Sequence, residues 1–283
     1  MSDFSIVIPA KNEAESLKSL IPAIRQLFPE AELIVVDDGS EDETQKICAE
    51  NNAQCIRHNY SMGNGAAIKS GARAATKDII VFMDGDGQHN PADIKRLLAE
   101  IDNGHDMVVG ARDRNSQASS GRSLANRFYN RLATWMVNHK VEDLTSGFRA
   151  VKKEKFLEFL YLLPNGFSYP TTSTMAFFRA GYSVKYVSIT ANKRIGKSHI
   201  NLLRDGIRFL LIIFKIGTLF SPLKLFVPIS ASLFLTGTFY YIYTLATAGR
   251  FTNMSATILL SSVIIFLIGL VSEQITQLVY KPK

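Results

Sequence analysis

The residues best suited to chemistry are two aspartates, Asp84 and Asp86, separated by a single glycine. They follow the apolar run 79–83 (IIVFM), which predicts a buried strand. Ligands of open α/β sheets bind at the carboxyl edge, where such a strand would present both carboxylates. Two carboxylates this close suit Mg²⁺ or Mn²⁺, ions that usually also bind a substrate's phosphates. The alternative is a solvated turn, because Asp and Gly are ordinary turn residues.

A second acidic pair, Asp37 and Asp38, follows another apolar run, 31–36. Up to residue 189, short apolar runs alternate with amphipathic stretches, which predicts an α/β fold with a mainly parallel sheet. We expect the stretch 142–149 to separate two helical stretches. Strands are expected at 4–9, 31–36, 53–57, 78–83, 107–110 and 184–189, and helices at 16–27, after Ser40 or Asp42, at 63–75, from Pro91, from Leu124 and at 173–180.

Gly63 and Gly65 open the alanine-rich helix expected at 63–75. Paired glycines before a helix are typical of dinucleotide-binding sites, but here the third glycine is missing and the pair follows the third strand. We therefore do not expect a nicotinamide cofactor. The glycines instead predict a close approach of the backbone to a nucleotide or sugar, since glycine has no side chain to obstruct it.

Arginines are concentrated between residues 112 and 131. The first part of this stretch predicts a loop and the second a helix. Such a run usually forms a solvated basic face. The functional alternative is a cluster that binds phosphate, since the planar guanidinium donates paired hydrogen bonds to phosphate oxygens. The arginines concerned are Arg112, Arg114, Arg122, Arg127 and Arg131.

The carboxy-terminal part of the chain is basic and apolar. From Ala180 onward it holds 11 Lys or Arg and two acidic residues, whereas the first 179 residues hold 21 basic and 23 acidic ones. Because the basic residues alternate with long apolar runs, they favour a membrane surface over nucleic acid as the binding partner.

Two cysteines, Cys48 and Cys55, are too few for a disulfide framework or a zinc site and fit a reduced domain. The first residues form no signal segment, so we expect the α/β domain to stay cytoplasmic.

Two uncharged runs, 225–246 and 254–271, are long enough to predict two transmembrane helices. The run 200–220 is apolar but carries Arg204, Arg208 and Lys215 on one stripe, which predicts an amphipathic helix in the membrane interface. Lysines before the first span and after the second predict that both ends are cytoplasmic. We therefore expect a cytoplasmic domain at 1–199, an interface helix at 200–222 and a two-helix anchor at 223–283.

Six short motifs follow one another along the chain. They are 8–13 (IPAKNE), 35–40 (VVDDGS), 83–91 (MDGDGQHNP), 110–112 (GAR), 145–149 (TSGFR) and 196–199 (GKSH). As an ordered set they resemble the inverting family 2 glycosyltransferases of the A-type fold, a Rossmann-like fold. The resemblance is greatest to the dolichyl-phosphate mannosyltransferase-like polyprenyl-phosphate glycosyltransferases, some of which carry a paired membrane anchor.

The resemblance implies inverting transfer of a hexose from a nucleotide-diphosphate sugar, of the GDP-mannose or UDP-glucose class, to the phosphate of dolichyl or undecaprenyl phosphate at the cytoplasmic membrane face. It implies Mg²⁺ or Mn²⁺ as cofactor, with Asp84, Asp86 and Gln88 as ligands. Nucleotide-sugar contacts are implied for Pro9, Ala10, Asn12, Glu13, Asp37, Asp38, Gly65 and Asp84. Contacts with acceptor or phosphate are implied for Arg112, Arg127, Arg131, Arg149, Arg194, Lys197, Ser198 and His199, and catalytic roles for Asp86, Arg112 and Asp143.

The implied acceptor, a phosphate, is already ionised at neutral pH and hardly needs a general base. Catalysis would then depend on placement of the substrates and on metal stabilisation of the leaving diphosphate. Asp143 is a candidate for orienting a substrate or acting as a weak base, and is equally compatible with capping a helix end.

His199 occupies a position where the family often has lysine. Arg194 and Lys197 could take over the phosphate contact of that lysine. Trp135, the one tryptophan, is outside any Gln-x-x-Arg-Trp motif, which argues against a processive polysaccharide synthase.

Two other functions are compatible with these residues. The same donor chemistry could serve a lipid hydroxyl acceptor, which would need a true base and hence a strict requirement for Asp143. The second alternative function is that of a catalytically inactive membrane scaffold, and the intact Asp84, Asp86 and Gln88 argue against it. Since two spans are few to enclose a lipid path, we also expect a homo-oligomer in the membrane.

Overall fold

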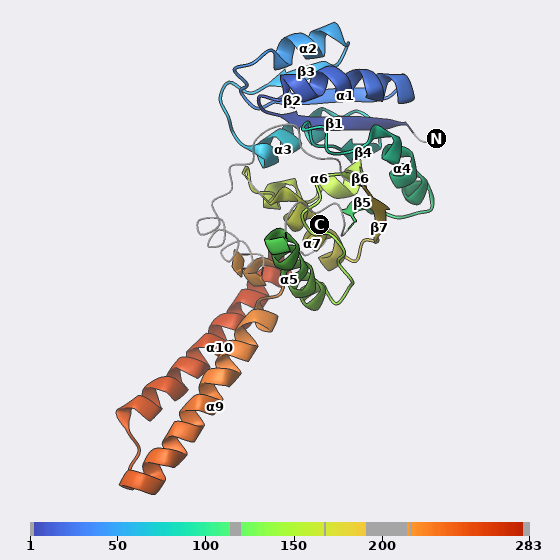
Figure 1. Cartoon of the computed structure of the whole chain (residues 1–283). Helices are drawn as coiled ribbons and strands as arrows, with labels where there is room; N and C mark the ends of the chain where they lie inside the picture. The colour runs from blue at the N-terminus through green and yellow to red at the C-terminus, as the bar shows by residue number, and fades with distance from the viewer. Residues whose placement is uncertain (1–2, 114–119, 167, 191–213, 216, 280–283) are drawn as a thin grey trace. The chain divides into compact units, whose positions relative to one another are not determined.

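The structure is a computed structural model that describes residues 3–113, 120–166, 168–190, 214–215 and 217–279, with the side chains of all of these except 120–126 and 279. The chain divides into two compact units, Met1–Ile200 and Asn201–Lys283 (Figure 1). The expected interface helix at 200–222 falls mostly outside the described residues.

The first unit is built on a seven-stranded sheet with the order β3-β2-β1-β4-β6-β5-β7. Only β6 runs antiparallel to its neighbours β4 and β5 among the described strands, so the predicted mainly parallel sheet is confirmed. The strands are β1 (Phe4–Ala10), β2 (Glu32–Asp37), β3 (Gln54–Arg57), β4 (Ile79–Phe82), β5 (Met107–Arg112), β6 (Arg149–Lys152) and β7 (Val184–Ile189).

Helices cover both faces of this sheet. Side chains alternate along β1, so that Ile6 and Ile8 join the core with α1, α2 and α4, while Val7 faces α3. On the α3 face, Phe82 packs against Phe156 of α6, with ring centroids 4.8 Å apart. The helices of this unit are α1 (Ala14–Leu27), α2 (Thr44–Glu50), α3 (Asn64–Ala74), η1 (Pro91–Asp93), α4 (Ile94–Asp102), α5 (Ser120–Val137), α6 (Lys153–Leu157), η3 (Leu160–Leu162) and α7 (Tyr169–Arg179).

The sequence pattern missed one strand. The stretch 142–149 was expected only to separate two helical stretches, but Arg149 begins β6, which fills the space between β4 and β5. Four residues with two apolar members are too few to show a strand period. The neighbouring helices also begin earlier than expected, α5 at Ser120 and α7 at Tyr169.

The second unit contains a helical hairpin of α9 (Pro222–Ala248) and α10 (Asn253–Val279). Stretches of both helices, Pro222–Ala248 and Asn253–Leu278, are long and apolar enough to cross a membrane, with mean hydropathies of 1.5 and 2.5. The helices approach closely where Gly269 lies against Phe226, and Ser230 Oγ donates to the carbonyl of Ser262 at 2.8 Å. This matches the two predicted transmembrane helices in position and length.

Candidate active site

The acidic residues expected at the site gather at one edge of the sheet. β1 lies between β2 and β4 and runs parallel to both, so their carboxyl ends lie side by side. Asp37 is the last residue of β2, in register with Ala10 of β1, and Asp84 and Asp86 follow the end of β4. This is the edge at which open α/β sheets bind ligands.

The turn after β1 is fixed to the turn after β2. Asn12 has a left-handed backbone with φ of 55°, and its N–H donates to Ser40 Oγ at 2.9 Å. Its Oδ1 accepts the N–H of Glu41 at 2.9 Å, and Asp42 Oδ2 accepts the N–H of Ala14 at 2.9 Å. These bonds hold four residues predicted to contact the nucleotide sugar in one connected segment at the edge: Pro9, Ala10, Asn12 and Glu13.

Asp38 is bonded to the loop 58–63 that follows β3. Its Oδ1 lies 2.8 Å from His58 Nδ1 and accepts the N–H of Met62, while Oδ2 accepts Ser61 Oγ and the N–H of Gly63, each at 2.8 Å. Burial by itself would raise the pKa of Asp38, but these hydrogen bonds lower it below its ordinary value. Asp38 is buried and its carboxylate is bonded to this loop, so Asp38 shapes the loop, while its expected contact with the nucleoside stays a prediction.

The backbone at Gly65 packs against the backbone of residues 164–166. Its N–H donates to the carbonyl of Gly166 at 3.1 Å, and the N–H of Ala66 donates to the carbonyl of Asn165 at 2.9 Å. A Cβ at position 65 would collide with the carbonyl oxygen of Pro164. The structure shows a close approach of this glycine to residues 164–166, and its expected contact with a nucleotide sugar stays a prediction.

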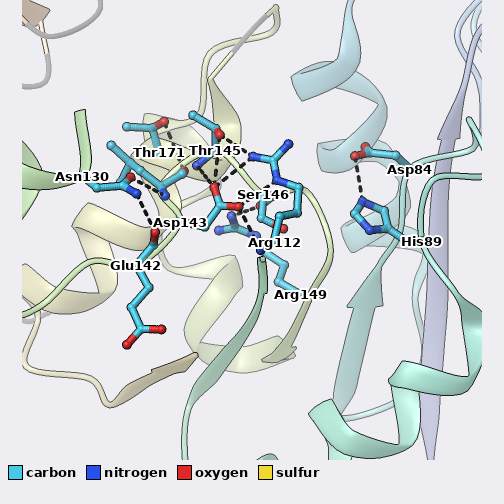
Figure 2. Close-up of polar contacts among 11 residues, drawn as sticks. Asp84, His89, Arg112, Asn130, Glu142, Asp143, Thr145, Ser146, Arg149 and Thr171 are labelled. Carbon is cyan, nitrogen blue, oxygen red and sulfur yellow. Dashed lines mark hydrogen bonds and ion pairs between the residues drawn. The ribbon is translucent and has the colours of Figure 1, made fainter. Parts of the chain in front are cut away.

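Asp84 is positioned from two sides. His89 Nε2 lies 3.7 Å from Asp84 Oδ2 (Figure 2), and the buried imidazole stacks on Phe148 with ring centroids 5.0 Å apart. On the other side, a Cβ added to Gly147 would lie 2.5 Å from the same oxygen. The side chain of Asp84 is nevertheless 32% exposed, so its carboxylate can still meet a ligand.

The three predicted metal ligands lie in the turn after β4. Asp86 Oδ1 accepts the N–H of Gln88 at 3.1 Å, and Gly87 between them has φ of 72°. The described residues contain no group of three or more His, Cys, Asp or Glu side chains suited to enclose a metal. Two carboxylates and an amide in one turn fit Mg²⁺ or Mn²⁺, which complete their coordination with substrate phosphates and water.

Arg112 at the end of β5 forms a two-pronged ion pair with Asp143. Arg112 Nε donates to Asp143 Oδ2 at 2.8 Å and Nη2 donates to Oδ1 at 3.0 Å, and Nη2 also donates to Thr145 Oγ1 at 2.6 Å (Figure 2). Burial alone would raise the pKa of Asp143, but the hydrogen bonds and charge of Arg112 lower it. Burial would lower the pKa of Arg112, but the hydrogen bonds and charge of Asp143 raise it, and the charges of Asp84 and Asp86 raise it further. A carboxylate held in this way is a weak base, and Asp143 orients Arg112.

Arg149 is fully buried, and its expected contact with an acceptor phosphate stays a prediction. Nη1 donates to the carbonyl of Pro170 at 3.0 Å and to Ser173 Oγ at 2.8 Å, and Nη2 donates to the carbonyl of Ser146. Burial lowers the pKa of Arg149. Tyr169 reaches the next carbonyl, with its hydroxyl 2.9 Å from the oxygen of Gly147. Arg149 and Tyr169 therefore hold the carbonyls of Ser146 and Gly147, and Gly147 lies against Asp84.

The other predicted basic residues are divided between α5 and the undescribed part of the chain. Arg127 and Arg131 are exposed on α5. Asn130 of the same helix donates to the carbonyl of Glu142 at 2.5 Å and accepts the N–H of Leu144 at 3.0 Å, which fixes the segment that carries Asp143. Arg194, Lys197, Ser198 and His199 lie outside the described residues.

Three residues that border the site were not assigned from the sequence: His89, Gly147 and Tyr169. His89 and Gly147 belong to the motifs 83–91 and 145–149, so their presence was indicated but their contacts with Asp84 were not. Tyr169 had no such indication, because it reaches the site only through the tertiary packing of α7.

A mainly parallel sheet with acidic residues at its carboxyl edge and two aspartates after β4 is the architecture of the A-type glycosyltransferases. Residues 5–160, more than half of the chain, match the model of glycosyl transferase family 2, and residues 221–278 match the GtrB C-terminal hairpin. The chain therefore belongs to glycosyl transferase family 2. The resemblance inferred from the motifs is confirmed.

Relatives and solved structures agree with this assignment. The undecaprenyl-phosphate 4-deoxy-4-formamido-L-arabinose transferase of Proteus mirabilis (strain HI4320) is 37% identical over 159 residues, 53% of this chain and 48% of the relative. The polyprenol monophosphomannose synthase of Mycolicibacterium smegmatis is 26% identical over 204 residues, 67% of this chain and 77% of the relative. The match to the first thus spans about half of that relative's length.

Glucosyl-3-phosphoglycerate synthase from Mycobacterium tuberculosis, solved with Mn²⁺ and UDP-glucose, has a similar fold. Its TM-score is 0.60 at 22% sequence identity, over 76% of this chain and 78% of that one. At this identity the likeness shows the fold alone.

Proposed function

We propose that this protein transfers a hexose, with inversion, from a nucleotide-diphosphate sugar of the GDP-mannose or UDP-glucose class to the phosphate of a polyprenyl phosphate, dolichyl or undecaprenyl. The observation that carries the proposal is the turn Asp84–Gln88 at the carboxyl edge of a family 2 domain whose chain continues into a membrane-type hairpin. The two relatives above are named for transfer to undecaprenyl phosphate and for synthesis of polyprenol monophosphomannose, which supports a lipid phosphate acceptor.

A divalent ion fits the donor side of this reaction. Asp84, Asp86 and Gln88 would hold Mg²⁺ or Mn²⁺ together with the donor diphosphate. When bound, the ion stabilises the negative charge of the diphosphate leaving group. Asp37 and the fixed turn at 9–13 border the same edge and would contact the nucleoside.

Arg112 is the candidate phosphate ligand at the carboxyl edge of the sheet, whereas Arg127 and Arg131 are exposed on α5. Its side chain is 26% exposed, and its guanidinium is oriented by Asp143 and Thr145. The charges of Asp84 and Asp86 also act on it, so it lies near the metal-binding turn. A guanidinium held in this position can neutralise phosphate charge without reorganising during the reaction.

The state of Asp143 favours a phosphate acceptor over a lipid hydroxyl. A hydroxyl would need a general base, and Asp143, the residue considered for that role, is bound by Arg112 and has a lowered pKa. A phosphate needs no such base, so positioning of the two substrates supplies most of the catalysis.

We further propose that the catalytic unit and both chain ends lie on the cytoplasmic side. Lys215 precedes α9, and Lys224 lies in its first turn, before the uncharged run 225–246, which supports this orientation by the positive-inside rule. Lys281 and Lys283 follow the second span outside the described residues. The expected homo-oligomer stays a prediction, and crosslinking in native membranes would test it.

The test is transfer from a panel of radiolabelled nucleotide sugars to polyprenyl phosphate in membranes that contain the full chain, with Mg²⁺, Mn²⁺ or a chelator. Asp86→Asn replaces the charged carboxylate of a predicted metal ligand by a neutral amide. Asp78→Asn is the matched control, because Asp78 is exposed at the opposite end of the same strand.

We expect a mild-acid-labile lipid-linked sugar that requires metal, forms with the control and is lost in Asp86→Asn. Product formed on a lipid hydroxyl would replace the proposed acceptor. Absence of any transfer by a folded, membrane-bound chain would refute the proposed function.

A further inference from the structure

Helix α5 has two faces of opposite character. Tyr129, Ala133 and Met136 point inward and are 7%, 3% and 6% exposed. Arg127, Phe128, Arg131 and Trp135 are all exposed, with Phe128 at 60% and Trp135 at 45%. At about 100° per residue these four lie within an arc of about 100°, opposite the buried stripe. We refer to Arg127, Phe128, Arg131 and Trp135 as the α5 ridge.

The chemistry of the ridge matches the surface of a bilayer. An arginine pairs with anionic headgroups, and large aromatic rings, tryptophan above all, are favoured at the level between headgroups and acyl chains. The whole of α5 contains three arginines and no acidic residue, so nothing on the helix repels an anionic surface. In a soluble protein without a membrane, two large exposed aromatic side chains on one helical stripe would be unusual.

We propose that the α5 ridge lies on the bilayer surface, with its arginines among anionic lipid headgroups and Phe128 and Trp135 in the interfacial layer. The same chain carries two candidate membrane spans, so a bilayer is the partner that this face meets. This contact is separate from the interface helix expected at 200–222 and adds an attachment within the catalytic unit itself.

The inner side of the helix connects this contact to the candidate active site. Asn130 binds the backbone on both sides of Asp143, and Asp143 in turn orients Arg112 (Figure 2). A bilayer that fixes α5 would therefore set the height of Arg112 relative to the headgroups, where the phosphate of a lipid acceptor lies. The inference deepens the proposed function, but its test does not require any transfer.

Trp135 makes the contact directly measurable, because it is the only tryptophan in the chain. The full chain is reconstituted in vesicles of phosphatidylcholine and phosphatidylglycerol that contain no polyprenyl phosphate. Quenching of Trp135 fluorescence is then measured with a nitroxide on the lipid headgroup and, separately, with aqueous iodide.

The matched control moves the tryptophan to α2. Glu50 is exposed at the end of α2, which packs on β3 at the opposite edge of the sheet from β7. In the double variant Trp135→Phe, Glu50→Trp, iodide should quench and the lipid nitroxide should not. We expect the reverse for Trp135. Equal behaviour of the two positions would overturn the proposal.

A second variant tests the arginines. Arg127→Gln with Arg131→Gln should lower nitroxide quenching of Trp135 by about twofold or more, since each arginine adds attraction to an anionic surface. The reduction should disappear in vesicles of phosphatidylcholine alone. Unchanged quenching in the anionic vesicles would show that these arginines do not contact headgroups.

Discussion

Gly147 lies directly against the carboxylate of Asp84, so that any side chain at position 147 would displace a predicted metal ligand. A Cβ there would be 2.5 Å from Oδ2 and 2.9 Å from Oδ1. The backbone cannot easily retreat, because Arg149 binds the carbonyl of Ser146 and Tyr169 binds that of Gly147. The position of Asp84 at the end of β4 therefore depends on a glycine in the loop before β6.

Gly147→Ala should impair transfer while leaving the protein folded. The methyl group would move the Asp84 carboxylate, and a displacement of about 1 Å at a catalytic site can cost about 100-fold in rate. We expect the largest change in the concentration of Mn²⁺ that gives half-maximal activity, measured by titrating the metal at saturating donor.

Gly166→Ala is the control for this substitution. Gly166 has open space where its Cβ would lie and is in no left-handed conformation. It should retain activity and metal response. If Gly147→Ala behaved like this control, the loop would not be positioning Asp84.

Arg112 and Asp143 should act as one unit. Arg112→Lys removes the paired hydrogen bonds, and Asp143→Asn removes the charge that orients the guanidinium. Both variants should lose transfer activity, and the double variant should be little worse than either single one. We expect a coupling of about 1–3 kcal/mol in a double-mutant cycle of kcat/KM.

The pH dependence separates this role from general-base catalysis. If Asp143 were the base, its replacement would remove an acidic limb from the profile of kcat. As an orienting residue, Asp143 should leave the shape of the profile unchanged in Asp143→Asn. Additive effects of the two substitutions, or a lost limb, would contradict the orienting role.

The sequence was sufficient to predict the edge of the sheet at which the site lies. β1, β2 and β4 are apolar runs that end in polar residues, so both their strand character and the position of Asp37, Asp84 and Asp86 follow from local pattern. The hairpin likewise follows from two long uncharged runs.

The contacts that position these residues could not be predicted in the same way. The carboxylate of Asp38 binds residues 20 to 25 positions further along the chain, and nothing in the local pattern shows that a loop closes on it. Arg149 was expected to contact an acceptor phosphate because of the family resemblance, and nothing in the local pattern shows that α7 supplies the hydroxyl and carbonyl acceptors that surround it. Both cases depend on long-range packing.

Asp38→Asn should disturb the loop 58–63 more than it disturbs the fold. The amide of asparagine accepts through its one oxygen only, so one backbone N–H, that of Met62 or Gly63, loses its acceptor, and Ser61 or His58 keeps a bond only by accepting instead of donating. We expect a loss of about 1–3 kcal/mol in the free energy of unfolding and a raised KM for the nucleotide sugar. Hydrogen exchange of the backbone amides of Met62 and Gly63 checks the cause. Amides that stay protected would contradict this role of Asp38.

Asp106 should make the catalytic unit sensitive to acid. Its Oδ1 accepts Lys152 Nζ at 2.9 Å and Lys155 Nζ at 2.8 Å, and Oδ2 accepts the N–H of Ser183 at 3.0 Å. Burial would raise the pKa of Asp106, but these partners lower it from an ordinary 3.8 to about 2. Because the folded-state pKa is depressed, the stabilisation is present above the ordinary value and is lost as the pH falls through about 2.

Asp106→Asn should therefore lower the free energy of unfolding by about 2 kcal/mol at pH 7, and this difference from the parent chain should shrink steadily below about pH 4. Denaturation of the full chain in detergent, followed by Trp135 fluorescence at a series of pH values, measures it. Asp78→Asn, at an exposed aspartate, should match the parent at every pH. A difference for Asp106→Asn that stayed constant down to pH 3 would mean that packing and neutral hydrogen bonds, rather than the charge of Asp106, stabilise the junction of β5, β6 and β7.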